Sequence, residues 1–126
     1  LIMPEERKVR PRPKVVPGDT YEMPTGCGSL FVTVTFDGDN EPLEVFARLG
    51  KSGGCASATL EAIGRAISLG LRGEIPFKRY TKSLRGISCG QATLDEGEKI
   101  LSCVDACARA MELAVETRRK ARDAKA

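Results

Sequence analysis

Apolar and polar positions alternate with a period of two in two neighbouring segments of the chain. In residues 29–36 the apolar positions include Leu30, Val32, Val34 and Phe36, and in residues 43–49 they include Leu43, Val45, Ala47 and Leu49. The intervening residues 37–40, Asp-Gly-Asp-Asn, have the composition of a turn. The pattern therefore predicts an antiparallel β-hairpin, with a weaker signal for a third strand at residues 20–23.

A helical period begins at Ala56 and predicts a central helix with a C-cap at Gly73. One apolar stripe consists of Leu60, Ile63, Ile67 and Leu71, and a second apolar side consists of Ala62, Ala66 and Leu69. Two apolar sides indicate a largely buried helix. Glycine weakens a helix by about 1 kcal/mol relative to alanine. Gly64 and Gly70 therefore indicate that another backbone approaches this helix closely.

Two further helices are expected toward the C-terminus. Pro76 is suited to open a short helix that extends to about Leu84. The longest helical pattern begins at Glu96, and its apolar face consists of Ile100, Val104, Cys107, Ala108, Met111 and Val115. The expected fold class is α+β: an N-terminal extended arm, an antiparallel β-hairpin or small sheet, and then three helices. The first helix is the buried central one, and the last is long.

The expected domain organisation is a basic, proline-rich arm at residues 1–18, a globular domain at 19–117 and a basic tail at 118–126. Prolines exclude regular structure in the arm, so we expect it to be extended and, if it is held at all, to be held by a neighbouring domain or chain. Solvated basic ends keep a small protein soluble, and they can also hold phosphates or acidic partners. They are not interleaved with aromatic side chains, so nucleic acid is not an expected partner.

The composition indicates a single domain in a reducing compartment. A chain of 126 residues can bury one hydrophobic core. It has neither an apolar run of roughly 18 to 20 residues nor a signal-peptide core, so a cytoplasmic protein without membrane contact is expected. Five cysteines in that compartment are buried thiols, metal ligands or redox thiols rather than disulfides. The chain has no histidine, which excludes histidine-dependent catalysis and histidine-bound metals.

Four cysteines share a local context that suits a metal ligand. Cys27, Cys55, Cys89 and Cys103 each lie beside glycine, serine or other small residues at the expected boundary of a helix or strand. Small neighbours allow backbone N–H groups to approach a metal-bound thiolate. The spacing is dispersed and lacks the C-x-x-C pairs of zinc fingers, so thiols packed against glycine turns remain the alternative. Cys107 lies in the apolar stripe of the last helix and is expected in the core.

A glycine-rich segment leads into the central helix and consists of Gly50, Lys51, Ser52, Gly53 and Gly54. A Walker A loop requires a further glycine five residues before this segment, where Val45 stands, so that motif is excluded. Two interpretations stay open. The segment is either an anion site built from backbone N–H groups with Lys51 and Ser52 beside them, or a tight turn between a strand and a helix.

Several stretches of the chain, taken in order over residues 10 to about 110, resemble the TSCPD domain. They are Arg-Pro-Arg-Pro at 10–13, Thr-Gly-Cys-Gly-Ser-Leu-Phe at 25–31, Leu-Gly-Lys-Ser-Gly-Gly-Cys-Ala at 49–56, Glu-Ala-Ile-Gly-Arg at 61–65, Leu-Arg-Gly-Ile-Ser-Cys at 84–89 and Leu-Ser-Cys-Val-Asp-Ala at 101–106. In that family the domain lies near the C-terminus of adenosylcobalamin-dependent (class II) ribonucleotide reductases, and it also occurs as free-standing small proteins. The sequence departs from the family at Gly90, where proline is usual, and it lacks the C-x-x-C-rich tail of many reductases.

The resemblance implies that Cys27, Cys55, Cys89 and Cys103 converge on one centre, because these four cysteines, and not Cys107, fall within the family's motifs. The four thiolates would hold an iron–sulfur cluster, which single glycine-flanked cysteines favour slightly, or zinc. The expected function is a small non-catalytic cysteine-site module that acts as a subunit or accessory domain of a larger oxidoreductase related to ribonucleotide reductase. The alternative is a structural or regulatory interaction domain with buried thiols and a glycine-rich turn that binds phosphate or a nucleotide. An independent enzyme is not expected, and a homodimer stays open.

Overall fold

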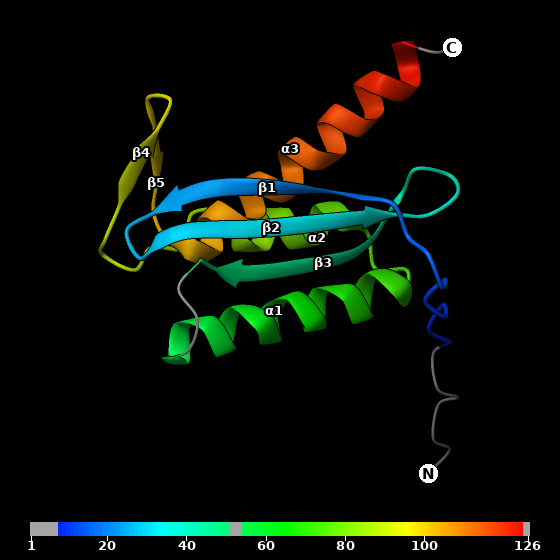
Figure 1. Ribbon diagram of the computed structural model, residues 1–126, viewed down its shortest axis with the longest axis horizontal. Coiled ribbons are helices and arrows are strands. Elements are labelled where there is room, and N and C mark those ends of the chain that lie inside the picture. Colours follow the sequence, from blue (N-terminus) through cyan, green and yellow to red (C-terminus); the bar gives the residue numbers. More distant parts are fainter. Residues whose placement is uncertain (1–7, 51–53, 125–126) are drawn as a thin grey trace.

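The computed structural model describes residues 8–50 and 54–124 and has an α+β architecture (Figure 1). Strands β1 (Gly18–Thr25), β2 (Gly28–Phe36) and β3 (Pro42–Leu49) form an antiparallel sheet in that order. Helices α1 (Gly54–Arg72) and α2 (Phe77–Leu84) follow, and a small hairpin of β4 (Thr93–Asp95) and β5 (Glu98–Ile100) precedes α3 (Cys103–Ala124). The small sheet followed by three helices, the last one long, confirms the expected fold class. The weakly signalled first strand is present as β1.

The sheet buries one face and leaves the other uncovered. The alternating apolar side chains of β2 have no exposed surface, and they are Leu30, Val32, Val34 and Phe36. Figure 1 shows α3 and α2 behind the sheet on this face, and Met111 of α3 belongs to the same core. Phe31 and Thr33 of β2 lie on the opposite face. In the described part of the chain, no helix is laid across that face.

Helix α1 lies along β3, which is an edge strand of the sheet (Figure 1). Gly64 allows the close approach, because a methyl group at this position would lie 3.0 Å from the Val45 carbonyl oxygen. The Ser68 hydroxyl accepts a hydrogen bond from the Val45 N–H and donates one to the Val45 carbonyl, each at 2.9 Å. The backbone approach expected at Gly64 is therefore confirmed, and the helix satisfies backbone groups that an edge strand would otherwise leave open.

The second apolar side of α1 is exposed, in contrast to the expectation. Ala62, Ala66 and Leu69 face solvent, and the exposed fraction of Leu69 is 53%. The helix is buried along one side only, because it lies beside the edge of the sheet and not between two layers. Gly70 also differs from the expectation, since the group that a methyl at this position would meet is the side-chain hydroxyl of Tyr80 and not a backbone.

Helix α1 ends in a Schellman motif whose left-handed residue is Glu74. The Ile75 N–H donates to the Gly70 carbonyl and the Glu74 N–H donates to the Leu71 carbonyl, each at 3.0 Å. Glu74 has a φ angle of 68°, a region that favours glycine. Gly73 directly follows the helix as expected, but it is its neighbour that takes the unusual conformation.

Helix α3 begins later than expected. The start at Glu96 is wrong, because Glu96 and Gly97 form the turn of the β4–β5 hairpin with φ angles of 50° and 85°, which a right-handed helix does not allow. Ile100 fits the helical stripe by its spacing, but it is buried as the last residue of β5. The helix then continues to Ala124 and so includes most of the basic C-terminal segment. None of the described helices combines the length and the apolar content that a membrane crossing requires.

The described part of the arm, residues 8–17, contains neither helix nor strand and is held by its own domain. Arg10 pairs with Asp37 at 3.0 Å, and Nε of Arg12 binds both carboxylate oxygens of Glu44 at 3.0 Å. The Arg10 N–H donates to the Arg72 carbonyl at 2.9 Å. These partners belong to the same chain, so the expectation that a neighbouring domain or chain holds the arm does not apply to Arg10 and Arg12.

Candidate functional site

The four candidate cysteines lie on segments near one end of the sheet. Cys27 is in the β1–β2 turn, Cys55 is in the first turn of α1, Cys89 follows α2, and Cys103 begins α3. Figure 1 shows the β1–β2 turn and the starts of α1 and α3 at the same end of the molecule. Cys27, Cys55 and Cys89 are exposed and Cys103 is partly exposed, whereas Cys107 is fully buried as expected. The interpretation as buried packing thiols therefore fits Cys107 but not Cys27, Cys55 or Cys89, and Cys103 is partly exposed while it packs against the core.

Cys27 and Cys103 are neighbours that share the hydroxyl of Thr25. The Thr25 oxygen accepts a hydrogen bond from the Cys27 N–H at 3.1 Å and another from the Cys103 thiol at 3.4 Å. A hydrogen bond with Cys103 and the charge of Cys103, with smaller effects of burial and of the charge on Cys89, raise the pKa of the Cys27 thiol. The fold thus brings Cys27 and Cys103 together, with Cys89 near enough for its charge to affect Cys27.

The loop that carries Cys89 is attached to the start of α3. The N–H and the thiol of Cys89 both donate to the Leu101 carbonyl, at 3.2 and 3.6 Å. The Ser102 hydroxyl donates to the Ile87 carbonyl and accepts the Asp105 N–H at 3.0 Å, so Ser102 is the N-cap of α3. The residues that begin α3 therefore also position the Cys89 loop, and the places of Cys89 and Cys103 depend on the same contacts.

A buried carboxylate that the sequence pattern did not single out joins these segments. Asp105 is 1% exposed and accepts hydrogen bonds from the Gly86 N–H at 2.9 Å, the Leu101 N–H at 3.0 Å and Arg109 at 3.2 Å. Burial opposes its charge, but the hydrogen bonds from Gly86 and Leu101 and the contact with Arg109 outweigh burial and lower the pKa of Asp105. Its signal in the sequence is the Ser-x-x-Asp pattern of residues 102–105, which is typical of a helix N-terminus.

The complete four-thiolate centre is not assembled in the described geometry. Cys55 lies directly after Gly54 at the start of α1. Across residues 8–50 and 54–124, no three or more histidine, cysteine, aspartate or glutamate side chains are grouped as a metal site. The contact between Cys27 and Cys103, with Cys89 near it, is the part of the expected centre that the structure contains. The convergence of all four cysteines stays a prediction.

Most of the expected anion site falls outside the described residues, because residues 51–53 are not among them. At one border of this segment, the Gly50 N–H donates to the Ser29 carbonyl at 2.8 Å, so this donor is already occupied. At the other border, Gly54 begins α1 with a φ angle of 85°, a conformation that favours glycine. These two glycines therefore fit the interpretation as a turn between a strand and a helix.

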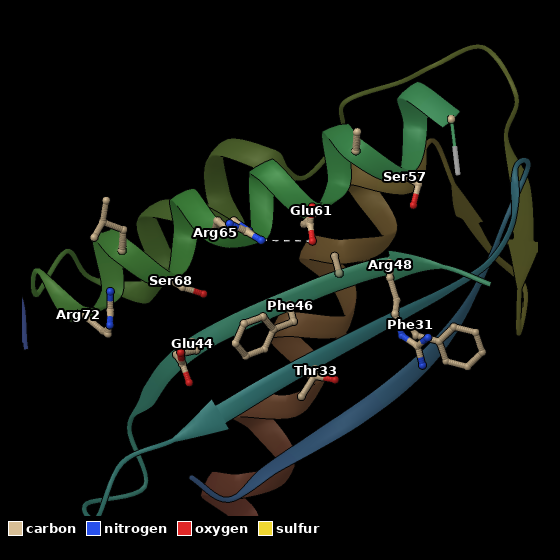
Figure 2. Close-up of a pocket in the computed structure, with 14 residues that line it drawn as sticks. Phe31, Thr33, Glu44, Phe46, Arg48, Ser57, Glu61, Arg65, Ser68 and Arg72 are labelled. Carbon is tan, nitrogen blue, oxygen red and sulfur yellow. Dashed lines mark hydrogen bonds and ion pairs between the residues drawn. The ribbon is translucent and has the colours of Figure 1, made fainter. Parts of the chain in front are cut away.

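A groove lies between α1 and the uncovered face of the sheet, with a volume of about 930 Å³ (Figure 2). Its floor includes Phe31 of β2 and Phe46 of β3, and its wall is one side of α1. Figure 2 shows Arg48 beside Phe31 and Arg72 toward the other end of the groove. The sequence could not reveal this groove, because its lining comes from two strands and a helix that only the fold brings together.

Comparison with known proteins agrees with the resemblance seen in the sequence. The family model described as the TSCPD domain matches residues 5–115, a range that includes all four candidate cysteines and ends within α3. No curated protein and no solved structure gives a significant match. The chain therefore belongs to the TSCPD domain family.

Proposed function

We propose that this domain is a non-catalytic cysteine-site module that binds zinc or an iron–sulfur cluster and serves a larger oxidoreductase as a subunit or accessory domain. The ligands in this proposal are Cys27, Cys55, Cys89 and Cys103. The observation that carries it is the meeting of Cys27 and Cys103 on the Thr25 hydroxyl, although the two cysteines come from a strand turn and a distant helix. Accessible thiols held together in this way are not required for packing, for which buried cysteines suffice.

The donor set favours a soft metal. Thiolates suit zinc and iron–sulfur clusters, whereas hard cations such as Mg²⁺ prefer oxygen ligands. Coordination would also reverse the local electrostatics, because the neighbouring thiols Cys103 and Cys89 favour the protonated form of Cys27, and a bound cation favours the thiolates.

The surrounding residues have a positioning role in this proposal. Thr25 holds the backbone of Cys27 and the thiol of Cys103, and Ser102 fixes the loop that leads to Cys89. Cys55 would supply the fourth thiol from α1, whose first turn lies at the same end of the molecule (Figure 1). A metal held there would connect the sheet to α1 and α3.

The accessory role is supported by the family and by the composition. The TSCPD domain is a small domain, and the resemblance to the module of adenosylcobalamin-dependent ribonucleotide reductases favours an oxidoreductase of that kind as the partner. Because the chain has no histidine, its cysteines lack the usual general base of a cysteine nucleophile. The alternative, an interaction domain with buried thiols and a phosphate-binding turn, has less support. Three of the four candidate cysteines are exposed and Cys103 is partly exposed, and the Gly50 N–H is bound to the Ser29 carbonyl.

Metal analysis of protein purified without oxygen tests the proposal. We expect either zinc in an equimolar amount or iron and sulfide with a brown colour. Cys27→Ser and Cys103→Ser should lose most of the metal. Cys107→Ala should keep it, because burial raises the pKa of Cys107 to about 12 and keeps this thiol protonated. Protein that contains neither metal, and that takes up neither zinc nor cobalt under reducing conditions, would refute metal binding.

A further inference from the structure

The groove between α1 and the uncovered sheet face has an aromatic floor. Phe46 of β3 is 42% exposed. Its direct partner across the strands is Thr33, and Phe31 is the partner of Arg48, so the two phenylalanines are diagonal neighbours on one face. Diagonal neighbours on adjacent strands are about 7 Å apart. Both side chains line the groove, and Figure 2 shows their rings at separate places along its floor, with Thr33 and Arg48 between them.

The carboxylates that line this groove already have cationic partners. Both oxygens of Glu44 bind Arg12 at 3.0 Å, and Glu61 pairs with Arg65 at 3.5 Å. Glu22 of β1 lies across from Phe31 in the strand register but does not line the groove. Negative charge in the groove is therefore largely neutralised within the domain.

Two guanidinium groups of the groove have no such partner. Among the described residues, neither Arg48 nor Arg72 forms an ion pair. The Arg48 guanidinium lies over the Phe31 ring, 5.4 Å from its centroid, and guanidinium planes also stack on bases. Nε of Arg72 is buried without a hydrogen-bond partner.

The basic arm passes the end of the groove where Arg72 lies. The backbone of the arm bonds to the Arg72 carbonyl at 2.9 Å, and the side chain of Arg12 reaches Glu44. Lys8 and Lys14 belong to the same segment, are exposed and form no ion pair among the described residues. Arm and groove together present an excess of positive charge next to accessible aromatic rings.

We propose that the groove binds single-stranded nucleic acid, with one base stacked on Phe46, another base of the same strand on the Phe31–Arg48 pair, and phosphates close to Arg72 and the lysines of the arm. Aromatic stacking platforms beside a cationic track are the general design of single-strand-binding surfaces, and open sheets with aromatic residues bind RNA in this way. A duplex does not fit, because its bases are stacked inside and cannot reach the floor. The groove contains no cysteine, so this inference is independent of the metal site.

A tryptophan reporter tests the proposal directly. The chain contains no tryptophan, so in Phe46→Trp all tryptophan fluorescence comes from the groove. An oligothymidylate of about ten nucleotides should quench this fluorescence, and the anisotropy of the labelled oligonucleotide should rise with the concentration of wild-type protein.

Phe46→Ala should weaken binding by about tenfold or more, because one stacked base is lost. Lys14→Ala should lower the slope of log affinity against log salt by about 0.7, the value for one phosphate of a single strand.

Lys120→Ala is the matched control, since it removes an exposed cation of α3 outside the groove and should bind like wild type. Circular dichroism establishes that each variant is folded. The proposal is overturned if no binding occurs at low salt, if Phe46→Ala binds as tightly as wild type, or if a duplex of the same length binds equally well. It is also overturned if polyglutamate displaces the labelled strand as effectively as unlabelled oligothymidylate, an outcome that would identify an acidic protein segment as the occupant.

Discussion

Asp105 in the first turn of α3 binds the backbone that follows α2 and the backbone that follows β5. Asp105→Ala should lower the free energy of unfolding by about 2 to 4 kcal/mol, because the partly buried N–H groups of Gly86 and Leu101 lose their acceptor and Arg109 keeps only Glu98 as a carboxylate partner. Urea denaturation measures this loss. Asp123→Ala, which removes an exposed carboxylate of the same helix, should change the free energy by less than about 0.5 kcal/mol. Equal effects of the two substitutions would show that the Asp105 contacts are not stabilising.

The carboxylates of Asp105 and Asp37 make the free energy of unfolding depend on pH. Burial raises the pKa of Asp105 and of Asp37, but their hydrogen bonds and arginine contacts outweigh burial and lower both values. In the unfolded chain both groups return to a pKa near 3.8. Their contribution to the free energy of unfolding is therefore complete above pH 3.8, and it is lost as the pH falls through the lower pKa of the folded state. Unfolding free energies measured from about pH 5 to pH 2 should fall less steeply for Asp105→Asn than for wild type.

Among the elements, α1 carries a built-in strain at its end. Glu74 has the left-handed conformation of the Schellman motif, which costs a residue with a side chain roughly 1 kcal/mol relative to glycine. Glu74→Gly should therefore raise the free energy of unfolding by about that amount and the melting temperature by a few degrees, as measured by thermal denaturation. Glu74→Ala retains the side-chain carbon and should give no such gain. A lower melting temperature for the glycine variant would contradict the assignment.

The elements also show which patterns a sequence can predict. The strands β2 and β3 were predictable because one side of the sheet is buried and the other is open, which imposes alternation on their side chains. The hairpin β4–β5 was not, because its strands have three residues each and Ile100 has the spacing of a helical core position. The exposure of Leu69 was missed for a related reason, since an apolar side does not show whether a second layer covers it.

For the molecule as a whole, the cysteine site would couple metal binding to folding. Cys27 belongs to the sheet and Cys103 to α3, so a shared metal would bind only the folded chain. Zinc added to reduced, metal-free protein should raise the melting temperature, with a stabilisation of about 4 kcal/mol at a thousandfold excess over the dissociation constant. Cys103→Ser should melt at the same temperature with and without zinc. Cys107→Ala should keep the zinc effect and lose only about 1 kcal/mol of packing.

Parts of both candidate sites depend on contacts that only the whole fold creates. The small-residue context of the cysteines marked Cys27 and Cys103 as candidates, but no spacing rule indicates that they meet on the Thr25 hydroxyl. The basic arm contains no aromatic residue that could stack on a base, so the sequence did not predict nucleic acid as a partner. The rings of Phe31 and Phe46 come instead from strands that the arm reaches through Arg12 and Glu44.

The hydrogen bonds of Ser68 have a consequence for self-association. An edge strand with open N–H and C=O groups is a template on which strands of other molecules can add. Ser68 occupies both groups of Val45, and Gly64 lets α1 lie directly on the rest of that edge. A local opening that lifts α1 would expose β3 while the remaining sheet stayed intact. We therefore expect aggregation of this domain to begin with the detachment of one helix, before the sheet itself unfolds.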